Sequence, residues 1–136
     1  MSVKYSGVLK NYISTELTHE SNAIVKTTAP KDNGGDGSLF SPTDLFSVSL
    51  GACGATTMGL YAKNHGIELE AVTFTAEKEM SPKPPRRVQK ITVHYSIKSN
   101  CDDEQFKKLI ASAKACPVRN SLSADVTVVE SFTRLT

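Results

Sequence analysis

The residues in this sequence best suited to chemistry are its cysteines. There are three, Cys53, Cys101 and Cys116, and none of them belongs to a Cys-x-x-Cys arrangement. A thiolate is a strong nucleophile, and its sulfur can be oxidised and then restored by another thiol. An odd number of well-separated cysteines does not fit the disulfide framework of a small secreted protein. The alternative at each position is a buried cysteine acting as a small hydrophobe in a reducing compartment.

Two of the three cysteines stand in settings that favour a reactive thiol. Cys116 precedes Pro117, which is expected to begin a helix, so its sulfur would lie at the N-cap, where free N–H groups favour a thiolate. Arg119 would place a permanent positive charge within about one helical turn of Cys116. The alternative is that Arg119 is simply an exposed residue at the helix start. Cys53 lies between an alanine and a glycine, which leave its sulfur approachable. Nothing local ionises Cys53, so a cation must come from elsewhere in the fold or from another chain.

The remaining candidate sites are weaker. Cys101 stands beside Asp102 and Asp103, whose charges would raise a thiol pKa, and we interpret it as incidental. The three histidines and three cysteines show no metal-ligand spacing, so we expect neither a metal nor another cofactor. The glycine-rich run at 33–37 lacks the Gly-Lys-Ser/Thr of a phosphate-binding loop and is interpreted as a turn.

A long helix over 42–64 is expected to carry Cys53. Ser41 and Asp44 form a capping-box pattern around Pro42, although Asp44 is also a candidate carboxylate partner for Arg119. Residues 45–62 form a charge-free stretch that is long enough for a membrane span. Their serine, threonine and glycine content favours instead a soluble helix without membrane insertion. Such a helix is about 35 Å long, and one small domain would struggle to cover it. We therefore expect a homodimer with buried central helices.

The rest of the chain predicts an α+β fold in a single domain, 1–136. Strands before a helix and strands after it are typical of this class. The strands are expected at 3–10, 13–18, 23–28, 69–79, 88–98 and 126–132, and the further helices at 102–115 and 117–123.

Length, composition and charge limit the possible partners. The chain has 136 residues, 39% of them hydrophobic and 22% charged, as in an ordinary globular domain. A net charge of +2 gives no reason to expect nucleic acid or a membrane surface as a partner. Because no basic and apolar signal segment opens the chain, we expect a cytoplasmic location.

Two runs resemble the OsmC/Ohr family of osmotically inducible protein C and the organic hydroperoxide resistance proteins. They are SPTDLFSVSLGAC at 41–53 and ACPVRNSL at 115–122. In that family a cysteine in the central helix lies sixty-odd residues before a second one in a Cys-Pro motif, and here Cys116 follows Cys53 by 63 positions. The loop at 29–37 and the closing segment at 124–132 are also similar to family members, so the resemblance covers nearly the whole chain.

The resemblance implies an intertwined dimer of antiparallel sheets around a long buried helix, and the activity of a thiol peroxidase. On that model Cys53 attacks an alkyl or lipid hydroperoxide and becomes a sulfenic acid, Cys116 resolves it as a disulfide, and an external dithiol reductant restores both. The alternatives are a non-enzymatic stress protein that binds a small molecule, and a redox sensor whose disulfide signals to a partner. Peroxide consumption with a dithiol, repeated on Cys53→Ser, separates these functions.

Two positions depart from the hydroperoxide-resistance pattern. In that branch an acidic residue ten positions before the first cysteine holds an arginine from the N-terminal strands. Here Thr43 stands at that position, and no arginine occurs before Arg86. The chain is thus similar to the more divergent OsmC-like proteins, and Arg119 is the expected substitute cation. The rival cations are three lysines of the N-terminal strands, Lys4, Lys10 and Lys26.

Overall fold

A computed structural model describes all 136 residues of the chain. The fold divides into two compact units, residues 1–45 and 46–136. Each unit contains one three-stranded sheet, and the long helix α1 (Pro42–Asn64) begins in the first unit and continues into the second. The expected α+β class is confirmed, with two sheets and a long helix.

The first unit is an antiparallel sheet followed by a short loop. Its strands β1 (Tyr5–Lys10), β2 (Ser14–His19) and β3 (Ile24–Thr28) pair in sequence order, and a short 3-10 turn, η1 (Lys31–Asn33), follows them. The unit ends in the predicted capping box, because the Ser41 N–H donates to Asp44 Oδ2 at 2.9 Å and the Asp44 N–H donates to Ser41 Oγ at 3.1 Å. These two bonds fix where α1 begins.

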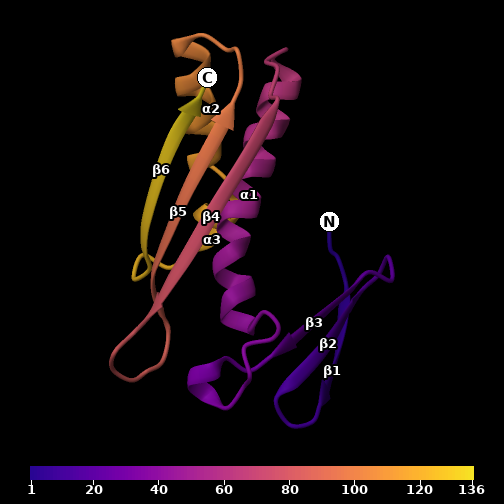
Figure 1. Ribbon diagram of the computed structural model, residues 1–136. Helices are drawn as coiled ribbons and strands as arrows, with labels where there is room; N and C mark the ends of the chain where they lie inside the picture. The colour runs from indigo at the N-terminus through magenta and orange to yellow at the C-terminus, as the bar shows by residue number, and fades with distance from the viewer. The chain divides into compact units, whose positions relative to one another are not determined.

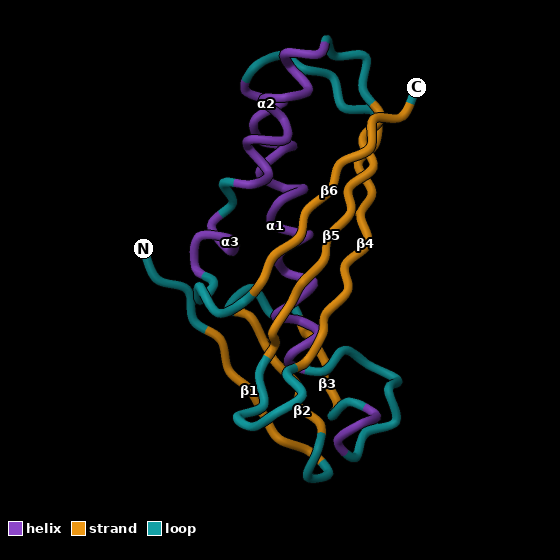
Figure 2. The backbone as a smooth tube through the Cα atoms, turned by 90° about the vertical axis from the view of Figure 1, so that its left-hand side faces the viewer, coloured by secondary structure: helices purple, strands orange, loops and turns teal.

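The second unit places its helices on one face of a mixed sheet (Figures 1 and 2). The sheet has the order β4, β5, β6, with bounds Ala71–Met80, Val88–Lys98 and Thr127–Leu135, and the helices α2 and α3 cover Asp103–Lys114 and Pro117–Ser121. From Ile91 onward the side chains of β5 alternate between buried and half-buried, and Ile91, Val93, Tyr95 and Ile97 are fully buried. The alternation of apolar and polar residues in the sequence over 91–98 predicts this buried face.

One pairing differs from the expected antiparallel sheets. Strands β4 and β5 form an antiparallel hairpin, but β6 runs parallel to β5. The cause is the connection between β5 and β6, which passes through α2 and α3, since a helical crossover returns the chain in the same direction. This crossover also brings Cys116, which lies between α2 and α3, near Tyr95 of β5.

Helix α1 is apolar but only partly covered within one chain. It is long and apolar enough to span a membrane by length and composition alone, and the core helix of a soluble protein passes the same test. In its most apolar stretch 33% of the residues are buried. The buried positions include Leu50, Gly54 and Met58, whereas Phe46 and Leu60 remain 44% and 56% exposed. Burial of the whole helix, as expected from the sequence, would therefore require contacts with atoms outside this chain.

Candidate functional site: a cysteine pair beside a buried ion pair

Cys116 lies at the N-cap of α3, as the sequence predicts. Its Sγ accepts a hydrogen bond from the Arg119 main-chain N–H at 3.4 Å, and Pro117 occupies the first helical position. The side chain is completely buried. A thiol in this position is held firmly and is shielded from solvent.

Cys53 meets Cys116 from α1. The two thiols are neighbours, and the interaction with Cys53 raises the pKa of the Cys116 thiol. Cys53 is half-buried and Cys116 is fully buried, so Cys53 is the more accessible of the two residues. The structure thus brings together the two cysteines that the sequence singles out, and both are free thiols.

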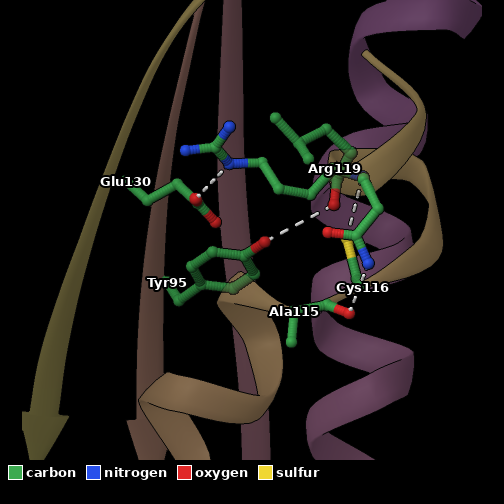
Figure 3. A network of polar contacts seen from close by, with 7 residues as sticks. Tyr95, Ala115, Cys116, Arg119 and Glu130 are labelled. Carbon is green, nitrogen blue, oxygen red and sulfur yellow. Dashed lines mark hydrogen bonds and ion pairs between the residues drawn. The ribbon is translucent and has the colours of Figure 1, made fainter.

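Arg119 pairs with Glu130, a residue that the sequence motifs do not assign to the site. Its Nε donates to Glu130 Oε1 at 3.1 Å (Figure 3). The Glu130 side chain is only 4% exposed, against 39% for Arg119, and its other oxygen, Oε2, is buried without a hydrogen-bond partner. The Arg119 side chain therefore binds the Glu130 carboxylate, while the Arg119 main-chain N–H binds Cys116.

Tyr95 completes the cluster from the centre of the sheet. Its ring stacks on Phe132, with centroids 4.9 Å apart, and its hydroxyl makes a long 3.5 Å bond to the Leu50 carbonyl. A Cβ added at Gly54 would overlap this hydroxyl, so the glycine next to Cys53 is what lets α1 pack on Tyr95. In the view of Figure 3 the phenol hydroxyl lies between the Glu130 carboxylate and Cys116.

The electrostatics of the cluster correct one expectation. Burial, more than any other cause, raises the pKa of the Cys116 thiol, and the Cys53 and Glu130 charges raise it further. The Arg119 main-chain N–H acts in the opposite direction but does not outweigh burial. The N-cap N–H favours the thiolate, as expected, but the pKa of Cys116 is raised overall because burial of the sulfur has the larger effect. Burial, together with the charges of Glu130 and the cysteines, also raises the pKa of Tyr95.

Asp44 and Cys101 have other surroundings. The Asp44 carboxylate accepts a hydrogen bond from the Ser41 N–H in the capping box. Asp44 thus caps the helix, the alternative to its expected role as partner of Arg119. Cys101 is buried just before α2, where its N–H donates to Ser99 Oγ at 3.2 Å. Cys101 is not among the groups that act on Cys116.

No group of three or more histidine, cysteine, aspartate or glutamate side chains is arranged to hold a metal ion. The site therefore consists of two thiols, a phenol and one ion pair.

We expect Gly54→Ala to destabilise the protein and Gly59→Ala to stabilise it. Alanine gains about 1 kcal/mol over glycine in a helix, but overpacking a buried site costs about 1–3 kcal/mol. A Cβ at Gly54 would overlap Tyr95, whereas a Cβ at Gly59, on the same helix, meets nothing within 4 Å. Urea unfolding of both variants measures the difference, and equal stabilisation by the two would contradict this packing.

Stability is expected to fall in alkaline solution because of Cys116 and Tyr95. Both pKa values are raised in the fold from ordinary values of 9.0 and 10.0, so the unfolded chain loses these protons first. Their stabilising effect is complete below those values and is lost as pH rises, by up to about 1.4 kcal/mol per pH unit for each group. Urea titrations across this range should show a smaller loss in Cys116→Ala, and an identical loss would contradict the assignment.

Comparison with known proteins places this chain in a family. A family model described as OsmC-like protein matches residues 35–131, which include both motif cysteines, Arg119 and Glu130. No curated protein sequence matches the chain.

Solved structures share the fold over nearly the whole chain. A protein of Psychrobacter arcticus 273-4, named for an osmotic stress induced and detoxification response, is 30% identical with a TM-score of 0.85, covering 96% of this chain and 94% of its own. An OsmC like protein from Mycoplasma pneumoniae is 20% identical with a TM-score of 0.83, covering 100% and 99%. An organic hydroperoxide resistance protein OsmC from Legionella pneumophila is 21% identical with a TM-score of 0.71, covering 98% and 97%. Together with the family model, these likenesses show that the chain belongs to the OsmC family.

Proposed function

We propose that this protein is a thiol peroxidase that reduces organic hydroperoxides, with Cys53 as the attacking cysteine and Cys116 as the resolving one. The observation that carries the proposal is the contact between a half-buried thiol and a fully buried one. A substrate from solvent can reach only the first, and the product of its oxidation forms beside the second. The hydroperoxide resistance proteins among the structural neighbours support the same role.

The cycle needs only these two sulfurs and an external dithiol. The Cys53 thiolate attacks the distal peroxide oxygen, the O–O bond breaks, and the alkoxide takes up a proton to leave as the alcohol. The Cys53 sulfenic acid then condenses with the Cys116 thiol, forming the S–S bond and releasing water. A dithiol reductant reduces the disulfide and returns both thiols.

The substrate class follows from the apolar stretch of α1 that carries Cys53. No charged residue lies between 45 and 62. An apolar surface favours alkyl or lipid hydroperoxides over hydrogen peroxide. We propose a cytoplasmic location, where dithiol reductants are available.

Peroxide consumption tests this function. The purified protein, a dithiol and an alkyl hydroperoxide should give catalytic turnover that exceeds turnover with hydrogen peroxide. Loss of turnover in Cys53→Ser, with turnover kept in Cys101→Ser, is the supporting result. Equal rates with and without the protein would refute the proposal.

The second candidate is a stress protein without peroxidase activity, either a small-molecule binder or a redox sensor. The observation that favours it is the Arg119 contact with Glu130, because the carboxylate neutralises the guanidinium nearest the cysteines. A redox sensor would form the Cys53–Cys116 disulfide without rapid turnover by a dithiol, and a binder would form none.

We further propose that the protein is a homodimer. Each unit exposes apolar side chains to a degree unusual for a monomer, which marks an interaction surface. They are Tyr5, Val8, Leu9, Ile24 and Val25 on the first sheet, and Phe46 and Leu60 on α1.

Sedimentation at micromolar concentration is expected to give twice the chain mass of 14.7 kDa. Leu60→Glu, which puts a charge on the exposed face of α1, should weaken the dimer, and Lys107→Glu on exposed α2 should not. A wild-type protein that sediments as a stable monomer would contradict the proposal.

A further inference from the structure

The Glu130 carboxylate has an unused oxygen inside the cysteine cluster. Oε1 is bound by Arg119, whereas Oε2 is buried and has no hydrogen-bond partner. A buried carboxylate oxygen without a partner is costly, so a purely structural ion pair gives no reason to keep it there. The free oxygen can accept one proton without releasing Arg119.

The Tyr95 hydroxyl lies between the Glu130 carboxylate and Cys116 in the view of Figure 3, without a hydrogen bond to either group. The charges of Glu130, Cys116 and Cys53 all raise the pKa of this phenol. Its only hydrogen bond, to the Leu50 carbonyl, is long at 3.5 Å. A hydroxyl can accept one proton while it donates another, so it can relay a proton between two neighbours.

We infer that Glu130 is the proton acceptor for Cys116 in the resolving step, with the Tyr95 hydroxyl as the relay. This inference rests on the proposed function and adds to it a route for the proton. Cys116 is buried and protonated, so its sulfur can attack only if a base inside the protein takes the proton.

The step balances with the groups present. Cys116 Sγ attacks Cys53 Sγ, the S–S bond forms, and the S–O bond of the sulfenic acid breaks. The Cys116 proton passes to Tyr95 Oη as the phenol proton passes to Glu130 Oε2. Both transfers then reverse toward the leaving hydroxide, which departs as water. Cys116 sulfur is oxidised, Cys53 sulfur is reduced, and the carboxylate ends unchanged.

Glu130→Gln separates this role from simple electrostatics because the two effects have opposite signs. The negative charge of Glu130 raises the pKa of Cys116, so its removal gives more thiolate and, on charge alone, faster attack. Loss of the proton acceptor instead slows attack, by about a hundredfold to ten-thousandfold for general-base catalysis. The glutamine oxygen can still accept the Arg119 Nε bond.

A peroxide-free assay tests the inference directly. In a Cys101→Ser background, Cys53 is converted to its mixed disulfide with thionitrobenzoate, and Cys116 attack releases the coloured thiol. This release replaces one S–S bond by another and needs the same base for the Cys116 proton. It therefore reports on Glu130 even if the protein consumes no hydroperoxide.

We expect Glu130→Gln and Tyr95→Phe to release thionitrobenzoate at least about tenfold more slowly, with a rate that rises tenfold per pH unit as Cys116 ionises. The wild-type rate should depend much less on pH. Asp103→Asn, which removes the exposed carboxylate of the Arg134 ion pair, is the matched control and should behave as wild type. A wild-type or faster rate in Glu130→Gln, with an unchanged pH profile, overturns the inference.

Discussion

Replacing Cys53 by serine is expected to lower hydroperoxide consumption by on the order of a thousandfold or more. A hydroxyl in that position is not ionised near neutral pH and cannot hold the transferred oxygen as a sulfenic acid. No other cysteine can take over, because Cys101 and Cys116 are buried. The measurement is initial-rate consumption of an alkyl hydroperoxide with a dithiol in excess.

Two controls make the cysteine assignment specific. Cys116→Ser should still form the Cys53 sulfenic acid, which a dimedone probe traps, but it should not form the intramolecular disulfide. Cys101→Ser should match the wild type in both readouts, since Cys101 is not among the groups that act on Cys116. Full activity in Cys53→Ser would remove the proposed role.

Replacing Arg119 by methionine is expected to raise the pKa of Cys116 and to destabilise the fold by about 2 kcal/mol. The substitution leaves the Glu130 carboxylate buried with neither oxygen bonded, and its charge then acts on Cys116 without neutralisation. The cost stays below that of breaking a fully buried pair because Arg119 is 39% exposed. Thiolate absorbance and urea unfolding measure the two effects.

A double-variant cycle isolates the ion pair from its surroundings. Glu130→Gln should lower the Cys116 pKa, and the variant with both substitutions should recover much of the stability lost in Arg119→Met. An unchanged cysteine pKa in Arg119→Met would show that another cation serves the thiols. The same titration on Lys4, Lys10 and Lys26 variants would then identify it.

Much of the fold is predictable from local patterns in the sequence. The capping box at Ser41 and Asp44 marks where α1 begins, and Pro117 marks α3, so the N-cap position of Cys116 follows directly. The alternation of β5 predicts its buried face. These features depend on neighbours within a few residues, which a sequence displays.

The polar half of the site depends on contacts between distant segments. Tyr95 lies in the middle of β5 and has the same pattern as its apolar neighbours, so nothing local distinguishes it from a core residue. Glu130 does carry a signal in the sequence, because it is the one charged residue among the alternate positions Val126, Val128, Glu130 and Phe132. A charge at such a position indicates a buried partner. That this partner is Arg119 could not be predicted from local patterns, because the crossover between β5 and β6 brings the two residues together.

Peptide mapping after mild oxidation shows which cysteines pair when the protein meets a hydroperoxide. The wild-type protein is treated with an alkyl hydroperoxide, its remaining thiols are blocked, and the digest is analysed by mass spectrometry without reduction. We expect a disulfide that joins the Cys53 and Cys116 peptides, with Cys101 recovered as a blocked thiol. A disulfide that includes Cys101, or no disulfide between Cys53 and Cys116, would contradict this expectation.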